Sequence, residues 1–381
     1  MEELKLGIVG LGVQGRHYAA ILSGAIRNLP KPEGCRLTAV SSRAPETEAA
    51  AASMGVKWFP DWKAMVESGA CDAIVITVPH YLHHEVAVYA LNRGIHVLCE
   101  KPAGIRASDV KQMLQARDGN PGTALAMLLN QRTNPLFAKL RAIIASGELG
   151  SLRRSNWIIN SWWRPDSYYA SNAWRGTWKG EGGGVVVNQL PHQLDLWLGF
   201  TGMPEQVYAL NIQGAHRNIA VENDVTITAR YPGGATGVLV SCTHDPLGTD
   251  RLELDFDQGK ILVEDSAKAT VYRFREREAV WNRTISHMDM PRLNRQEGQL
   301  WDKEALTAGQ PAGMAYVEIF ENFAAHILRG QPLIADGEAG LRQVQLANAI
   351  QLSGWKNAPV PVPCDEEEFN RELQKRIDSE R

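Results

Sequence analysis

The sequence predicts an α/β protein of two domains, with a parallel sheet in the first third of the chain and a mainly antiparallel sheet in the rest. The chain has 381 residues, more than one compact core usually holds. Residues 1–125 alternate apolar runs with helical patterns, as in a parallel sheet covered on both faces. After about residue 150, strand-like segments follow one another across tight turns. We therefore expect domains at residues 1–125 and 126–381, the second of α+β type.

The first domain alternates strands and helices. Strands are expected in four near-continuous runs of Val, Ile and Leu, namely LKLGIVG, RLTAVSS, CDAIVITVP and IHVLCE. Helices are expected in VQGRHYAAILSGAI, PETEAAAASMG and HHEVAVYALNRG, and the last two end at a Gly, which is typical of a helix carboxyl terminus. This order indicates repeated strand–helix–strand units.

The second domain consists of paired strands followed by late helices. VTITARYPGGATGVLVSCTHD predicts two strands around a Gly-Gly turn, and LELDFDQGKILVED predicts two more around Asp-Gln-Gly. Helices are expected in AYVEIFENFAAHILRG and GEAGLRQVQLANAIQLSGW. Residues 276–312 are polar with weak periodicity, and we interpret them as a long loop.

The composition narrows the class of protein. Hydrophobic residues make up 44% and charged residues 22%, as in ordinary globular proteins. A net charge of −3 without a dense Lys/Arg run argues against a nucleic-acid partner. Neither a membrane span nor a signal-peptide pattern is found. Five scattered cysteines fit free thiols, so we expect a cytoplasmic protein with no nucleic-acid or membrane partner.

A glycine-rich turn, GIVGLGVQGRHYA, follows the first strand and opens the first helix. Gly10, Gly12 and Gly15 form a Gly-x-Gly-x-x-Gly pattern in the context that makes it specific for dinucleotides. Gly10 permits the tight turn, Gly12 lets a pyrophosphate approach, and Gly15 allows close packing of helix on strand. Val13 and Gln14 begin the helix whose N–H groups would face the phosphates. The repeated strand–helix order disfavours a turn without a ligand and predicts a Rossmann domain.

The end of the second strand bears on the choice between NAD and NADP. An acidic residue there would bind both ribose hydroxyls and repel a 2′-phosphate. This chain instead has Ser41, Ser42 and Arg43, whose hydroxyls and guanidinium suit a 2′-phosphate. The alternative is that Arg43 is solvated and the adenosine end is loosely held. We expect NADP or NAD as the cofactor, with NADP favoured.

Several stretches resemble the Gfo/Idh/MocA oxidoreductases: the glycine-rich turn, TVPHYLHHEVAVYALNRGIHVLCEKPAG, GGGVVVNQLPHQLDLW and the late ANAIQLSGW. The resemblance covers nearly the whole chain. It implies a Rossmann domain followed by a domain with an open, mainly antiparallel sheet. It also implies an NAD(P)-dependent dehydrogenase acting on a CH–OH group of a sugar or cyclitol, such as a ring hydroxyl of an inositol or C3 of a glucoside.

The resemblance also implies roles for individual residues. Lys101 corresponds to the family's catalytic lysine, which reaches both the cofactor ribose and the reacting hydroxyl. The family's Lys–Pro peptide is often cis, so a cis peptide is expected at Lys101–Pro102. The cofactor face is completed by Thr77, Pro79, His80, His83 and Glu100. His80 is a departure, because the family usually has Asn there. A solvated ion pair at a surface strand end is the alternative interpretation of Glu100 and Lys101.

Asn188, His192 and Asp195 are spaced at i, i+4 and i+7, which predicts one face of a helix beginning near Asn188. His192 has the ordinary pKa of a general acid–base group near neutrality. The family usually has Asp where this chain has Asn188, which can orient a hydroxyl but cannot relay a proton. We expect Lys101, His192 and Asn188 to be catalytic and Asp195 to lie beside them. The alternative is an ordinary surface pair of His192 and Asp195.

A second histidine feature, His83-His84-Glu85, invites a metal site. Adjacent residues on a helix point apart, so they make poor joint ligands. We therefore expect no metal.

The segment between residues 160 and 184 is rich in aromatic and guanidinium groups. Aromatic faces stack on the C–H faces of sugar rings, while Arg and Tyr bind hydroxyls. The expected substrate residues are Arg132, Trp163, Arg164, Tyr168, Tyr169, Trp174 and Arg175, together with Asn188, His192 and Asp195. Packing in the domain core or at an oligomer interface is the alternative. Because no Lys/Arg cluster suited to a sugar phosphate is evident, we expect a neutral sugar, glycoside or cyclitol.

Two other functions share these features. One is a glycoside-cleaving enzyme that uses the cofactor transiently, and the other is a non-catalytic sensor on the same fold. Retention of Lys101 and His192 counts against the sensor, while Asn188 counts slightly for it. An open sheet face needs covering, so we also expect a homodimer or homotetramer.

Overall fold

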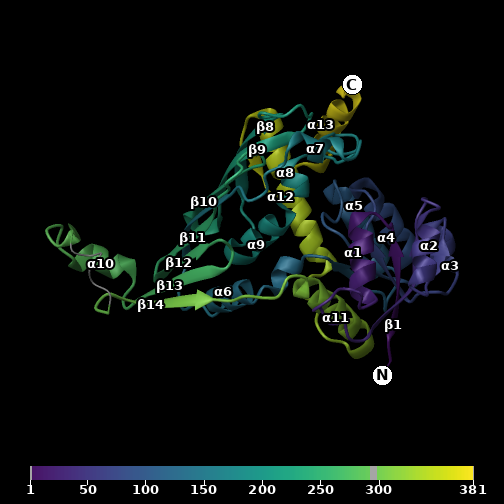
Figure 1. Ribbon diagram of the computed structural model, residues 1–381. Helices are drawn as coiled ribbons and strands as arrows, with labels where there is room; N and C mark the ends of the chain where they lie inside the picture. Colours follow the sequence, from purple (N-terminus) through teal and green to yellow (C-terminus); the bar gives the residue numbers. More distant parts are fainter. Residues whose placement is uncertain (1, 292–297, 381) are drawn as a thin grey trace.

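The structure, a computed structural model, describes residues 2–291 and 298–380 and contains two sheets, one from the first third of the chain and one from the rest. Figure 1 shows the two sheets on either side of the long helix α12 (Gly337–Lys356). The first sheet is parallel and the second is mainly antiparallel, which confirms the predicted fold class.

The first sheet has six parallel strands in the order β3-β2-β1-β4-β5-β6. Its strands are β1 (Leu4–Val9), β2 (Cys35–Ser41), β3 (Lys57–Phe59), β4 (Ala73–Ile76), β5 (His96–Cys99) and β6 (Leu125–Met127). The helices are α1 (Val13–Leu22), α2 (Thr47–Ser53), α3 (Trp62–Glu67), α4 (His83–Leu91) and α5 (Ala107–Asp118). All four predicted strands and three predicted helices are present. The order reverses between β1 and β4, so a crevice for a ligand is expected at their carboxyl ends.

The first sheet extends slightly beyond the expected first domain. Strand β6 begins at Leu125, the last residue of the expected domain, and ends at Met127. Strand β6 pairs with β5 through Val97 and Leu125. Strands β3 and β6 are three residues long, too short for an apolar periodicity to reveal them.

The second sheet has nine strands in the order β14-β13-β12-β11-β7-β10-β9-β8-β15. They are β7 (Leu152–Ile159), β8 (Gln206–Gln213), β9 (Glu222–Arg230), β10 (Thr236–Cys242), β11 (Asp250–Phe256), β12 (Gly259–Glu264), β13 (Lys268–Phe274), β14 (Trp301–Thr307) and β15 (Val360–Pro361). Strands β7 and β10 pair in parallel, and the other pairs are antiparallel. The two predicted hairpins, β9–β10 and β11–β12, are confirmed.

The interpretation of residues 276–312 as a loop is wrong in part. Helix α10 (Glu278–Thr284) and strand β14 lie in this stretch, and β14 pairs with β13 along its whole length. Only Leu306 of β14 is buried, so this edge strand carries too few apolar residues for its period to be recognised. Residues 292–297 of the stretch lie outside the described residues.

The remaining helices are α6 (Pro135–Ala145), α7 (Asp166–Ala170), α8 (Val185–Asn188), α9 (Pro191–Thr201), α11 (Met314–Arg329) and α13 (Glu366–Ser379). Helix α11 returns to the first sheet, where Phe320 and Phe323 share a core with Ile8. Helix α12 joins both halves, because Val344 packs in the first-sheet core and Ile350 in the second. Within residues 2–291 and 298–380, none of the helices combines the length and apolarity needed to cross a bilayer.

Candidate active site

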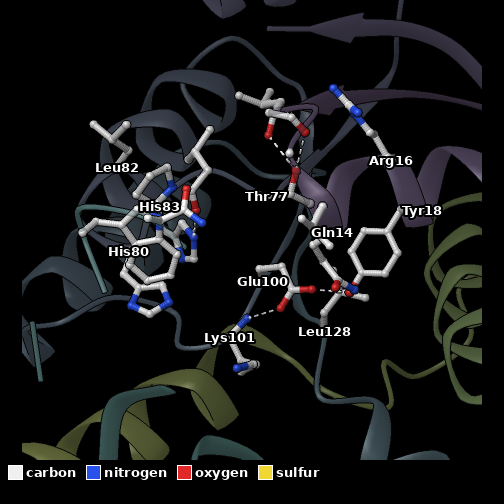
Figure 2. Close-up of a pocket in the computed structure, with 18 of the residues that line it drawn as sticks. Gln14, Arg16, Tyr18, Thr77, His80, Leu82, His83, Glu100, Lys101 and Leu128 are labelled. Carbon is white, nitrogen blue, oxygen red and sulfur yellow. Dashed lines mark hydrogen bonds between the residues drawn. The ribbon is translucent and has the colours of Figure 1, made fainter. Parts of the chain in front are cut away.

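A cleft of about 1430 Å³ opens at the carboxyl ends of β1, β2, β4 and β5, where the order of the first sheet reverses. Most of the expected cofactor residues line it: Gly10, Gly12, Val13, Gln14, Ser41, Ser42, Arg43, Thr77, Pro79, His80, His83, Glu100 and Lys101. The chain after the first domain contributes Trp162, Arg164, Tyr168, Asn172, Trp174, Arg175, Asn188, Gln189, His192 and Tyr316. Figure 2 shows Gln14 and Tyr18 facing Glu100 and Lys101, with His80 and His83 on the other side.

The glycine-rich turn has the geometry that a dinucleotide requires. Gly10 has a φ of +98°, which favours glycine, and its carbonyl accepts a hydrogen bond of 2.6 Å from Thr77 Oγ1. A methyl group at Gly15 would lie 2.0 Å from the Gly10 carbonyl oxygen, so only glycine fits where α1 meets the turn. A methyl group at Gly12 would meet nothing within 4 Å, because that backbone borders the open cleft. The turn thus leaves room for a pyrophosphate against its own N–H groups.

The end of β2 supplies the groups that bear on the adenosine ribose. Ser41 is buried, whereas Arg43 is exposed at the cleft edge. Two residues that sequence reasoning missed line the same region. Arg16 donates to the Leu11 carbonyl over 3.1 Å, and Asp61 accepts from the first N–H groups of α3. The only sequence signal for Asp61 is its helix-capping position.

Glu100 and Lys101 do not form a solvated pair at a surface strand end. Glu100 accepts hydrogen bonds from Tyr18 Oη and, over 2.9 Å, from the Lys101 backbone N–H. Lys101 Nζ donates to the Asn188 carbonyl over 2.7 Å, so it links the two halves of the chain. Burial raises the pKa of Glu100 and lowers the pKa of Lys101, and each group's charge partly opposes the other's shift. The Lys101–Pro102 peptide is cis, as expected.

Asn188 is held by a carboxyl group that sequence reasoning missed. Its Nδ2 donates to Glu181 Oε1 and, over 3.2 Å, to Tyr168 Oη. The other Glu181 oxygen accepts from the Gly176 N–H over 2.7 Å. Burial raises the pKa of Glu181 to about 7, although these two donors and the nearby cations favour the carboxylate. The only sequence signal was an acidic residue inside a run of glycines.

The predicted helix face carrying Asn188, His192 and Asp195 is wrong. Asn188 ends α8, and α9 begins afresh at Pro191, so no single helix spans the three residues. Pro191 occupies the first turn of α9, where its missing N–H costs nothing. The break turns Asn188 toward Glu181, while His192 lines the cleft.

His192 has a different acid–base character from the one expected. Burial, followed by the nearby Lys101 charge, lowers its pKa to about 3. The expectation of a pKa near neutrality is therefore wrong, and the ring is neutral at neutral pH. Its Nδ1 is buried and has no hydrogen-bond partner among the described residues.

Four expected substrate residues do not line the cleft. Arg132 and Asp195 form a buried bidentate ion pair over 2.7 and 2.6 Å, which links the turn before α6 to α9. Tyr169 hydrogen-bonds to Thr243 over 2.9 Å, and Trp163 is about half exposed to solvent. These four residues pack between elements or lie at the surface. Other residues close to them in the sequence line the cleft.

The histidines near Pro79 form hydrogen bonds with backbone carbonyl groups. His83 lies 2.8 Å from the carbonyl oxygens of both Pro102 and Val78, so its two ring nitrogens are occupied. His80 Nδ1 lies 3.1 Å from the Glu181 carbonyl, and burial lowers its pKa to about 3. Across residues 2–291 and 298–380, His, Cys, Asp and Glu form no cluster of three suited to a metal ion.

Comparison with protein families gives two matches, one over most of the first sheet and one over part of the second. Residues 4–125 match the model for the oxidoreductase family with an NAD-binding Rossmann fold. Residues 137–262 match the Gfo/Idh/MocA C-terminal domain.

Individual relatives are similarly related. An oxidoreductase of Rhizobium meliloti is 23% identical over 93% of this chain and 97% of its own. An NADP(+)-dependent scyllo-inositol 2-dehydrogenase of Bacillus subtilis is 36% identical, but only over 32% of this chain and 37% of its own length. The WlbA dehydrogenase of Bordetella pertussis, solved with NADH and UDP-GlcNAcA, superposes with a TM-score of 0.76 at 24% identity over 96% of this chain and all of that one. The chain belongs to the Gfo/Idh/MocA family of oxidoreductases and carries its NAD-binding Rossmann domain.

Proposed function

We propose that the protein is an NAD(P)-dependent dehydrogenase that transfers a hydride between nicotinamide and a secondary ring hydroxyl or ketone of a sugar, glycoside or cyclitol. The observation that carries the proposal is the position of Lys101. Its ammonium group is partly buried in the cleft at the end of β5, 2.7 Å from the Asn188 carbonyl and on the same cleft as the glycine-rich turn. A cation in this place would face both a bound dinucleotide and a substrate on the second domain.

Lys101 would bind the reacting hydroxyl and exchange its proton. Burial lowers the pKa of Lys101, which brings the neutral amine closer to the working pH, as a general base requires. The bound nicotinamide supplies hydride acceptance and donation at its ring. His192, which is neutral, would orient the hydroxyl through a ring nitrogen and would not store the proton. Asn188 would hold Lys101 and Tyr168 in register.

NADP fits the end of β2 better than NAD does. Arg43 lines the cleft there, and none of the described carboxylates lies within ion-pair distance of it. Asp61 also lines the cleft, but both its oxygens accept from backbone N–H groups of α3. Relatives support both cofactors, because the Bacillus subtilis enzyme is named for NADP(+) and the Bordetella pertussis structure contains NADH.

The test is NAD(P)H absorbance with purified protein and a panel of inositols, glucosides, sugar acids and their keto forms, in both directions. We expect turnover of at least one member. Lys101→Ala should then lower kcat by about 10²-fold or more while the cofactor still binds, because the lysine acts mainly in the transition state. An unchanged kcat would remove Lys101 from the mechanism. Silence across the panel would favour transient-redox glycoside cleavage or sensing instead.

A further inference from the structure

We infer that the substrate carries a carboxylate, bound by Arg164 and Arg175, and is therefore a sugar acid or a carboxylated cyclitol. The inference rests on the proposed function and names the substrate class of the same cleft. It differs from the neutral substrate expected from the sequence. The sequence shows no cluster of Lys and Arg, but it does not show which arginines lack an acidic partner in the folded protein.

The two guanidinium groups gather around one ring on the substrate side of the cleft. Arg164 lies 4.8 Å and Arg175 4.2 Å from the centre of the Tyr168 ring, and all three line the cleft. The charge of Lys101 is close enough that both arginines help to lower its pKa. The two arginines therefore border the same cleft as Lys101, from the second domain.

Protein groups satisfy little of the hydrogen-bonding capacity of these arginines. Arg164 Nη1 donates over 3.3 Å to the Trp163 carbonyl, and Arg175 Nη1 donates to Tyr168 Oη. The Nε atom of each is shielded from solvent and has no acceptor among the described residues. A guanidinium has five N–H donors, so most of them are left for another acceptor.

Other partly buried arginines of the chain pair directly with carboxylates. Arg132 makes two hydrogen bonds to Asp195, and Arg117 pairs with both Asp118 and Glu338. Within the described residues, no carboxylate lies within 4 Å of either Arg164 or Arg175. The contrast indicates that the charge of these two is balanced by something other than the protein.

The acidic groups near Arg164 and Arg175 interact with other protein groups. Both oxygens of Glu181 accept from Asn188 and Gly176, and burial raises its pKa to about 7, so it is only partly charged at neutral pH. Asp166 is largely exposed and lies 3.9 Å from Arg217. Arg175 acts on Glu181 only through space, and neither acid pairs directly with Arg164 or Arg175, so an anionic ligand would be their first direct ion-pair partner.

The geometry favours a carboxylate on the substrate over the phosphates of the cofactor. Those phosphates belong at the glycine-rich turn and at Arg43, on the first domain. Arg164 and Arg175 lie on the second domain, beside the indole rings of Trp162 and Trp174, which offer flat surfaces for a sugar ring. The planar guanidinium fork matches a carboxylate in two parallel hydrogen bonds.

The experiment compares matched pairs that differ only in the acid group. Methyl glycosides of glucuronic, galacturonic and mannuronic acid, each with its neutral hexose counterpart and the corresponding 6-phosphate, are assayed by NAD(P)H absorbance. We expect kcat/KM for the acid of at least one pair to exceed that of its neutral partner by about 10- to 100-fold, the scale of a charge-assisted hydrogen bond. Arg175→Gln and Arg164→Gln should each reduce this preference while the cofactor Kd is unchanged.

Two variants keep the outcome interpretable. Arg175→Lys retains the positive charge but loses the planar guanidinium group, so it should keep part of the preference for the acid. Turnover by this variant would also show that a substitution at this position still folds. Lys179→Gln removes a positive charge from the same segment outside the cleft and should leave the preference intact.

The result has three distinguishable forms. If the neutral member of the pairs is turned over as well as the acid, or if the 6-phosphate is preferred, the carboxylate inference is wrong and the dehydrogenase proposal stands. A weakened cofactor Kd in the Arg175→Gln variant, with no change in preference, would assign the arginines to the cofactor and overturn the inference. If no member of this set or of the wider panel is turned over with either cofactor, the proposed function fails and the inference falls with it.

Discussion

Arg43 gives the sharpest test of cofactor preference at the scale of a single residue. Only NADP carries a 2′-phosphate, so Arg43→Ala should raise the Kd for NADP by about 10- to 100-fold and change the Kd for NAD by much less. Arg93→Ala is a suitable control, because Arg93 stacks on Tyr89 outside the cleft. The two Kd values are measured by quenching of tryptophan fluorescence. Equal losses for both cofactors would show that Arg43 does not read the phosphate.

The Asn188 amide donates to the Glu181 carboxyl group. Exchanging the amide and the carboxyl between the two positions tests whether this hydrogen bond stabilises the protein. Asn188→Asp would set a second carboxyl against Glu181 and remove the amide donor, so it should be destabilising by about 1–3 kcal/mol. Glu181→Gln should also be destabilising, because the two Glu181 oxygens accept from Asn188 and Gly176 and the new amide nitrogen would set a donor against one of them. The double variant restores one amide facing one carboxyl.

We therefore expect the double variant to be more stable than the sum of the single changes predicts, by about 1 kcal/mol or more. Thermal or denaturant unfolding of all four proteins measures this coupling. Strict additivity would mean that the two side chains do not interact in solution. A near-wild-type kcat for Asn188→Asp would further show that the amide itself is not needed for turnover.

The same carboxyl gives a pH dependence of stability. Burial raises the pKa of Glu181 from 4.5 to about 7, so between these values the folded protein retains a proton that the unfolded chain has released. Stability should accordingly fall as the pH rises through this window and level off above it. Glu222, whose pKa burial also raises to about 7, contributes in the same window. Glu181→Gln should flatten part of the slope in Tm against pH, and an unchanged slope would contradict the assignment.

At the scale of elements, two glycines in the turn between β1 and α1 are expected to have different roles, one in packing and one in cofactor binding. Gly15→Ala would place a methyl group 2.0 Å from the Gly10 carbonyl, so it should lower Tm and weaken cofactor binding together. Gly12→Ala meets no protein atom within 4 Å and should leave Tm unchanged, yet raise the cofactor Kd by about 10-fold or more by blocking the pyrophosphate. Calorimetry and cofactor titration on both variants give the comparison. Unaltered binding in the Gly12→Ala variant would mean that the pyrophosphate lies elsewhere.

Elements with a strong local signal could be predicted from the sequence, and elements defined by tertiary contacts could not. The buried parallel strands and the two hairpins carry continuous runs or turn residues that only one structure explains. Strand β14 carries little apolar signal and exists because β13 offers it a partner. The break between α8 and α9 was hidden because Asn188 and His192 keep helical spacing across it.

The candidate site divides in the same way. Residues tied to a motif, such as Gly10, Gly12 and Lys101, lie on the cleft. Arg132 and Asp195 looked like substrate residues because their charge was visible and their mutual pairing was not. Glu181 was missed because its importance comes from burial against Asn188, which no spacing along the chain encodes.

At the scale of the whole molecule, the two faces of the second sheet are covered differently. Helices α9 and α12 pack on the face that carries Trp157, Ala209 and Ile227. On the opposite side, Leu210 and Ile212 are 48% and 51% exposed. We expect this face to pair with a second copy of the chain, giving a homodimer or homotetramer.

Light scattering after size-exclusion chromatography measures the assembly directly. The wild-type protein should have a mass of two or four chains, and a combined Leu210→Glu and Ile212→Glu variant should shift toward one chain, because carboxylates would be buried at the interface. Leu247→Glu is the matched control, since Leu247 is 96% exposed in the loop between β10 and β11 and does not lie on this face. A monomeric wild type would contradict the expected assembly, and a dimer that survives the double substitution would place the interface on another surface.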